Sequence, residues 1–93
     1  MQKLLWWIIA GKRGGKNRAR ILKLISERPY NAHQISEELC LDYKTVRHHI
    51  KILEKNNLIQ PTGDTYGKLY FLSSKMEENY EIFEEIWSKL NIK

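Results

Sequence analysis

The sequence predicts a mainly α-helical domain with one small β-hairpin, which is an α+β fold. Apolar residues recur at helical spacing in several segments, and the clearest stripe runs from Val46 through Ile50 to Leu53. The pattern changes around residues 62–64, where a Thr-Gly-Asp turn signal is followed by a short strand-like segment at residues 67–72. A chain of 93 residues has room for one domain, so we expect a single domain over residues 1–93.

The first third of the chain predicts an apolar segment, a loop and a helix. Residues 2–10 are apolar on every side and fit either a helix or a strand, whereas residues 11–16 contain three glycines and three cations. A helix is expected over residues 17–28, with Asn17 as its N-cap. Pro29 ends this helix, because the residue before a proline disfavours the helical region.

The central segment, residues 31–58, predicts two helices joined by a tight turn. Asn31 is suited to cap the first helix, and Gln34 stands at the reciprocal position of a capping box. Asp42 completes the turn and caps the second helix, where its carboxylate also suits the positive end of the helix dipole. The asparagines at 56–57 end that helix, since asparagine tolerates the left-handed conformation.

The last third predicts a hairpin and a final helix. Residues 58–61 and 67–72 pair as two strands, and Ser74 with Glu77 starts a helix that continues to residue 91. Apolar residues then step by four and three along one face, which is the spacing of a coiled-coil seam. The seam consists of Met76, Tyr80, Phe83, Trp87 and Leu90.

This order of elements is that of a winged helix-turn-helix, in which the second motif helix lies in the DNA major groove. We expect its body over residues 17–72. The flanking segments, residues 2–10 and 74–91, are expected to be N- and C-terminal dimerisation helices. Because both are rich in exposed apolar positions, they need a partner surface; the alternative is that the seam packs entirely on its own domain.

The distribution of charge favours a polyanionic partner. The net charge is +5 and the isoelectric point about 9.4. Residues 1–72 contain 13 Lys/Arg and 6 Asp/Glu, whereas residues 73–93 contain 3 Lys and 5 Glu. The basic body is therefore expected to follow DNA phosphates, and the acidic C-terminal helix is expected to stay away from them.

Several other classes of function are not expected. The single cysteine, Cys40, excludes an internal disulfide and a multi-thiolate metal site, and it favours a cytoplasmic location. The apolar run at residues 4–10 is too short to span a bilayer and does not resemble a signal peptide. No cofactor and no metal are expected, and no nucleophile–base pair indicates an enzyme. Metal-ligand spacing is also missing among the three histidines, His33, His48 and His49.

The second motif helix supplies the candidate base contacts. Its N-terminal half is the part of a recognition helix that usually reaches base edges, and Arg47 has the planar fork that pairs with guanine O6 and N7. The alternative is a solvated helix face, where most surface cations lie. His49, at the edge of the buried stripe, is interpreted as structural or phosphate-contacting. The candidate DNA contacts are Tyr43, Lys44, Thr45, Arg47, His48 and Lys51.

Two further groups are candidates for phosphate contact. Glycines in the loop at residues 11–16 permit close approach of the backbone to phosphate, although a flexible connector is the alternative. In the wing, Lys68 is the candidate and Thr65 a weaker one, whereas Asp64 would repel phosphate. Tyr66 and Tyr70 are expected to pack within the hairpin. The basic cluster of the loop comprises Lys12, Arg13, Lys16, Arg18 and Arg20.

Four stretches within residues 13–73 carry a resemblance to a known family: RGGKNRARIL, RPYNAHQIS, LDYKTVRHHIKILEKNNLI and YGKLYFLS. In these stretches the chain resembles the ArsR-like winged-helix regulators that are common in archaea. The resemblance implies a dimeric, DNA-binding transcriptional regulator. It does not extend to metal sensing, because metal-sensing members carry paired cysteines near the start of the first motif helix and residues 30–35 contain none.

The sequence thus predicts a transcriptional regulator that binds specific sequences of double-stranded DNA as a homodimer. A two-fold dimer would separate its recognition helices by about one DNA turn, roughly 34 Å. A non-specific architectural DNA-binding protein is the alternative, and a winged helix that binds only proteins is a third class, against which the exposed cations argue. The expected interface residues are Leu5, Trp6, Ile9, Tyr80, Phe83, Trp87 and Leu90.

Overall fold

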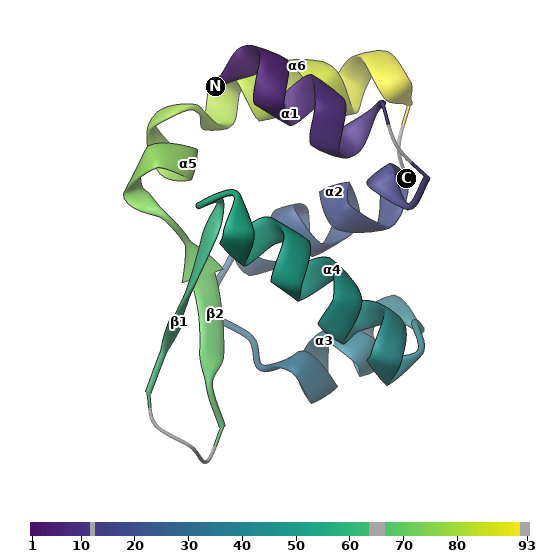
Figure 1. The fold of residues 1–93 in the computed structure, drawn as a ribbon, viewed down its shortest axis with the longest axis vertical. Helices are drawn as coiled ribbons and strands as arrows, with labels where there is room; N and C mark the ends of the chain where they lie inside the picture. The colour runs from purple at the N-terminus through teal and green to yellow at the C-terminus, as the bar shows by residue number, and fades with distance from the viewer. Residues whose placement is uncertain (12, 64–66, 92–93) are drawn as a thin grey trace.

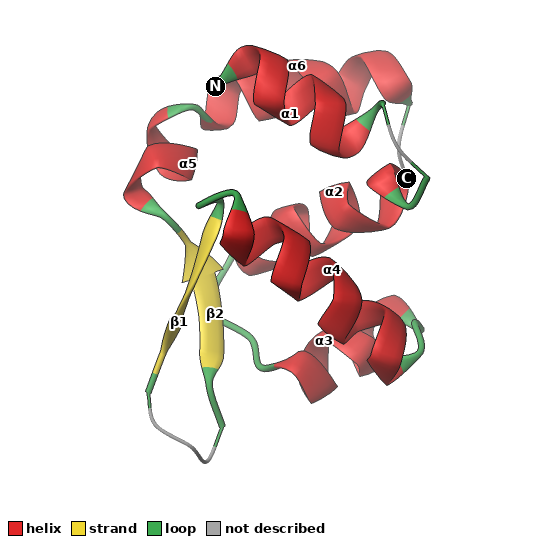
Figure 2. Ribbon diagram, viewed as in Figure 1, coloured by secondary structure: helices red, strands yellow, loops and turns green. Residues whose placement is uncertain are grey.

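The computed structural model describes residues 1–11, 13–63 and 67–91. These residues form a winged helix-turn-helix that is mainly helical with one two-stranded antiparallel hairpin, which confirms the predicted fold class (Figure 2). The elements are, in chain order, α1 (Gln2–Ile9), α2 (Gly15–Ile25), α3 (Ala32–Leu39), α4 (Tyr43–Lys55), β1 (Ile59–Thr62), β2 (Leu69–Leu72), α5 (Ser74–Glu78) and α6 (Tyr80–Leu90).

The first and the last helix of the chain lie together at one end of the molecule. Helices α1 and α6 lie side by side there, α2 crosses beneath them, and α3 and α4 lie on the far side of α2 (Figure 1). The hairpin descends beside α4, away from α1 and α6. The segment that contains the helix-turn-helix is therefore separated from the terminal helices by the core.

The helix-turn-helix begins and ends where its capping residues predict. The Asn31 side chain accepts a hydrogen bond from the Gln34 backbone at 2.8 Å, and the Gln34 side chain accepts one from the Asn31 backbone at 2.9 Å. The Asp42 carboxylate accepts from the amides of Lys44 and Thr45. After α4, Asn57 adopts the left-handed conformation with φ of 58°. The predicted capping box, turn and stop signal are confirmed.

Several predicted boundaries were wrong. Helix α2 has Gly14 as its N-cap, three residues before the expected cap at Asn17, and it ends at Ile25, three residues before the expected end at residue 28. The C-terminal segment is not one helix, because Asn79 separates α5 from α6. The side chain that caps α5 belongs to Ser73, which accepts from the Met76 amide. The ambiguous N-terminal segment is a helix, α1.

The hairpin has a register in which Ile59 pairs with Leu72 and Thr62 with Leu69. The segment before α3 pairs with β2, because Tyr30 and Tyr70 exchange two backbone hydrogen bonds. Pro61 lies in β1, which has β2 as its only neighbouring strand in this two-stranded sheet, so its missing N–H interrupts no central ladder. The wing is thus anchored at its base to the start of the helix-turn-helix.

The core contains residues from every helix, including both terminal helices. The α4 stripe of Val46, Ile50 and Leu53 is fully buried, as predicted. Leu5 and Ile9 of α1 and Phe83 of α6 are also buried within this chain. The expectation that these three residues face a second subunit is therefore corrected. Each completes the core of its own chain, where burying such a side chain contributes roughly 1.5–3 kcal/mol.

Candidate nucleic-acid interface

Helix α4 presents a polar face on the side opposite its buried stripe. Tyr43, Lys44, His48 and Lys51 are exposed, whereas Thr45 and Arg47 are half-buried. Residues three and four apart lie on one side of a helix, so Lys44, Arg47, His48 and Lys51 form one continuous surface. We call this surface the α4 face. Four of the six candidate DNA contacts of this helix thus lie on one face, and Tyr43 and Thr45 line hollows that this face borders.

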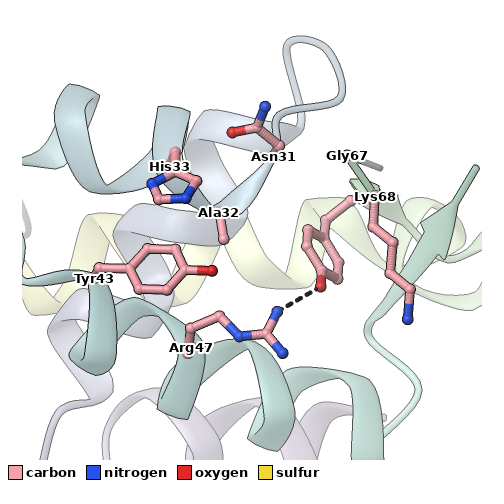
Figure 3. Close-up of a pocket in the computed structure, with 8 residues that line it drawn as sticks. Asn31, Ala32, His33, Tyr43, Arg47, Gly67 and Lys68 are labelled. Carbon is pink, nitrogen blue, oxygen red and sulfur yellow. Dashed lines mark hydrogen bonds between the residues drawn. The ribbon is translucent and has the colours of Figure 1, made fainter. Parts of the chain in front are cut away.

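A hollow of about 500 Å³ separates the α4 face from the wing (Figure 3). Arg47 lies at its centre and donates a hydrogen bond from Nη1 to the Tyr70 hydroxyl at 2.9 Å. Tyr70 is buried, in agreement with its expected packing in the hairpin. The hydrogen bond fixes the guanidinium between α4 and the wing. The hollow is lined by Asn31, Ala32, His33, Tyr43, Arg47, Gly67, Lys68 and Tyr70.

Tyr43 is held by a second aromatic ring at the edge of this hollow. Its ring stacks on that of His33, with centroids 4.3 Å apart and an angle of 16° between the planes. Tyr43 remains 40% exposed, so the stack limits its rotation without hiding it. The start of α3 is therefore part of the same surface as the start of α4, and His33 belongs to the candidate interface.

The wing contributes one described cation. Lys68 is exposed and lines the hollow beside Gly67. The expectations for Asp64, Thr65 and Tyr66 lie outside the described residues.

The structure separates the cations of the basic loop. Arg13 lies beside the start of α4, whereas Lys16 lines a different hollow with Ile9, Ala10, Leu90 and Asn91. Arg20 donates to the carbonyl of Leu39 at the end of α3, at 3.0 Å. Lys12 lies outside the described residues. The described cations of the loop therefore do not form a single phosphate-binding cluster, and among them Arg13 is the one that the fold brings to the α4 face.

Arg18 is a correction to the predicted DNA contacts, because its side chain is only 1% exposed. Its Nε donates to the Ile8 carbonyl at 2.9 Å, in the last turn of α1, where a cation complements the helix dipole. Nη1 lies 3.4 Å from Nδ1 of His49. Within the described residues, Nη2 has no hydrogen-bond partner. A buried guanidinium thus connects α1 with α4 and does not face DNA.

His49, which the sequence predicts to be structural or phosphate-contacting, is buried beside the α4 stripe. It is 5% exposed, and burial lowers its pKa to about 4, assisted by the positive charges of Arg18 and His48. The imidazole is consequently neutral at physiological pH. A neutral ring can accept a hydrogen bond from Arg18, whereas a protonated ring would repel it.

Three placements differ in what the sequence could show of them. His33 and Tyr70 reach the interface through tertiary contacts with Tyr43 and Arg47, for which the sequence contains no spacing signal. The burial of Arg18, in contrast, has a local signal. Arg18 precedes Ile21, Leu22 and Ile25 by three, four and seven residues, which places it on the buried stripe of α2.

The surface of the terminal helices differs from the α4 face. Trp6 and Trp87 are half-buried, and each ring has a lysine ammonium of its own chain over it, Lys89 at 6.0 Å and Lys23 at 5.7 Å. Trp7 is 50% and Leu90 38% exposed, and Tyr80 is half-buried. Five glutamates of α5 and α6 are exposed around these groups: Glu77, Glu78, Glu81, Glu84 and Glu85.

In the part of the chain that the structure describes, no helix is long and apolar enough to cross a membrane. Among the same residues, no three histidine, cysteine or acidic side chains are grouped so that they could hold a metal ion.

Comparison with known proteins supports the fold and the family. The sequence matches the family described as "Bacterial regulatory protein, arsR family" over residues 15–60, which extend from the start of α2 into β1. No curated protein matches the chain.

Solved structures of regulators are similar to this one. The transcriptional regulator BldR of Sulfolobus solfataricus gives a TM-score of 0.75 at 14% identity, over 96% of this chain and 65% of BldR. The homodimeric winged helix-turn-helix DNA-binding domain of Mb0332 from Mycobacterium bovis, a possible ArsR-family regulator, gives a TM-score of 0.73 at 14% identity. The match covers 97% of this chain and 79% of that domain.

A mutant of ZitR from Lactococcus lactis gives a TM-score of 0.61 at 25% identity, over 80% of this chain and 56% of ZitR. The chain therefore spans less than two thirds of the length of ZitR and of BldR. The matched family is one of regulatory proteins, and the similar solved structures are those of regulators. The chain has a winged helix-turn-helix fold, and its residues 15–60 are similar to the arsR family of regulatory proteins.

Proposed function

We propose that this chain is a transcriptional regulator that binds specific sequences of double-stranded DNA as a homodimer. The observation that carries the proposal is the α4 face, a surface of cations and hydrogen-bonding groups at the N-terminal half of the second motif helix. A helix of this kind fits the major groove, about 12 Å wide, where each base pair presents a distinct pattern of donors and acceptors.

Arg47 is the principal candidate for reading a base. A guanidinium has five N–H donors, and the bond to Tyr70 uses only Nη1 of Arg47. The remaining donors stay available for guanine O6 and N7, and the fixed position lowers the entropy that binding costs. On α4, Lys44 and His48 line a hollow together with Arg47, and Thr45 lines the neighbouring one. Tyr43 is positioned by His33.

The wing and the start of α3 supply contacts to the DNA backbone. Lys68 is exposed beside the hollow that Arg47 occupies, close to the first turn of α3. A lysine there would neutralise a phosphate next to the bases that α4 reads. Phosphate contacts of this kind fix the register of the protein on the duplex and add affinity for every sequence.

Two copies of the chain would associate through the surface of α1 and α6. Trp7 and Leu90 are the most exposed apolar side chains of that surface, and Tyr80, Trp6 and Trp87 are half-buried beside it. The domain of Mb0332, which has the same fold, is homodimeric. Sedimentation at micromolar concentration tests this part of the proposal: a dimer supports it, and a monomer contradicts it.

The experiment that tests the function is selection of duplexes from random sequence with the purified protein, followed by measurement of affinity for the selected and a scrambled duplex. Arg47→Ala should weaken binding of the selected duplex by roughly 5–150-fold, equivalent to 1–3 kcal/mol, and relax the preference at one position per half-site. Lys75→Ala removes an exposed cation of α5 and is the matched control, with little expected effect.

A common affinity for all duplexes that falls with salt, with no selected sequence, would replace the proposal by the architectural alternative. No binding of duplex DNA even at low salt would exclude both.

A further inference from the structure

A second hollow flanks the α4 face on the side away from the wing. Its volume is about 500 Å³, similar to that of the first, and it lies between the loop before α2 and the first turns of α4. A helix in the major groove has a phosphate backbone on either side of it. The second hollow is lined by Arg13, Gly14, Lys44, Thr45, His48 and His49.

The groups around this hollow favour an anion. None of the six lining residues is acidic, and Arg13 and Lys44 are exposed cations. Behind the lining, the Arg18 guanidinium lies against His49, and a carbon placed at the Cβ position of Gly14 would be 3.3 Å from its Nη1. Nη2 of Arg18 has no hydrogen-bond partner within the described residues, so its charge is not paired there.

The backbone around the second hollow also favours an anion. Gly14 adopts a left-handed conformation with φ of 85°, and a Cβ at this position would lie 2.8 Å from Cε1 of His49. The glycine therefore lets the loop approach α4 closely. Helix α2 starts at the next residue without a side-chain cap and without an acidic residue in its first turn, which leaves the positive end of its dipole unopposed by side chains.

We propose that the second hollow binds one phosphate group, held by Arg13, Lys44 and His48 in front of the buried Arg18. This inference rests on the proposed function, because we assign the phosphate to the DNA backbone on the side of α4 opposite the wing. The first hollow and Lys68 would then face one strand of the duplex, and the second hollow the other. Inorganic phosphate has the same chemistry and is the alternative source.

The test replaces phosphates of the selected duplex one at a time by neutral methylphosphonates and measures affinity for the wild type and for Arg13→Ala. At one position in each half-site, the replacement should weaken wild-type binding about tenfold, the effect of losing one charge-assisted hydrogen bond. The same replacement should weaken Arg13→Ala less than about twofold, because its partner is already missing. Arg13 is exposed, so the variant should fold. Lys75→Ala should show the wild-type pattern.

A second arm distinguishes the source of the phosphate. The Cε1–H resonances of His48 and His49 are followed by NMR while inorganic phosphate is added without DNA. Weak binding of inorganic phosphate together with the methylphosphonate coupling supports the assignment to DNA. Saturable binding that Arg13→Ala abolishes, without any coupling to a methylphosphonate, would confirm a phosphate site but overturn its assignment to DNA.

If neither arm responds to Arg13→Ala, the inference is overturned. The proposed function would remain supported in that case, provided that the wild type still prefers its selected duplex and Arg47→Ala still relaxes that preference.

Discussion

The α4 face and the layer of α1 and α6 use aromatic and charged residues in opposite ways. At the α4 face, cations point outward and aromatic rings such as Tyr43 and Tyr70 fix the positions of their neighbours. In the terminal layer, Phe83 faces the core of its own chain and the exposed charges are mainly glutamates. An apolar seam at helical spacing therefore does not identify a subunit interface, because the same spacing completes a protomer's core.

The largest expected effect tests whether the seam belongs to the core. Phe83→Ala should lower the free energy of unfolding by about 3–5 kcal/mol, because it opens a cavity among fully buried side chains. Urea unfolding at two protein concentrations measures this. Leu90→Ala, at the exposed end of the same seam, is the control. It should change unfolding by less than about 1 kcal/mol and should instead weaken self-association.

A Phe83→Ala variant that keeps its stability as a monomer and only fails to dimerise would return Phe83 to the subunit interface. The contrast between the two regions would then be lost.

The next effect concerns the contact between Arg18 and His49, through which α4 is connected with α1. The pKa of His49 is lowered from 6.5 to about 4 in the folded protein, so the unfolded chain binds more protons between these pH values. The stability that His49 contributes is complete above pH 6.5 and is lost as the pH falls towards 4. Since one pKa unit corresponds to about 1.4 kcal/mol, we expect a loss on the order of 2–3 kcal/mol.

Unfolding of the wild type and of His49→Gln as a function of pH checks this prediction. The variant lacks the titrating ring but keeps the charged groups around it, Arg18 on α2, His48 on α4, and Arg13 and Lys44 along the hollow. The difference in unfolding free energy between the two proteins should therefore shrink from pH 7 to pH 4. Parallel curves would show that His49 titrates normally.

A smaller effect is expected at the bond between the recognition helix and the wing. Tyr70→Phe removes the hydroxyl that accepts from Arg47 and leaves the ring in place. Affinity for the selected duplex should fall by roughly 2–10-fold, equivalent to 0.5–1.5 kcal/mol, while affinity for a scrambled duplex stays the same. The ratio of the two affinities is the measurement. An unchanged ratio would mean that this hydrogen bond does not orient Arg47 for base contact.

The regions also differ in how far the sequence predicts them. The helix-turn-helix depends on local signals, since Asn31 with Gln34 and Asp42 each bond to backbone within three residues. Its buried and exposed faces follow from helical period alone. The hydrogen bond from Arg47 to Tyr70 joins residues 23 positions apart, so no local pattern contains it.

The layer of α1 and α6 is harder to predict, because its packing depends on contacts between residues that are far apart in the sequence. The spacing of Phe83 and Leu5 shows that they are buried, but not whether the covering surface belongs to the same chain. The break at Asn79 interrupts a continuous apolar period, so the period alone predicted one helix. For Arg18, the cation-rich loop suggested the surface, whereas its place on the α2 stripe indicated the interior.

The measurement that tests the central claim most directly is mapping of backbone amide shifts by NMR while the selected duplex is added. If the α4 face reads DNA, the largest changes should occur from Tyr43 to Lys51 and at Lys68, and the amides of α1 and α6 should change little. Changes concentrated in α1 and α6, with α4 unaffected, would contradict the account.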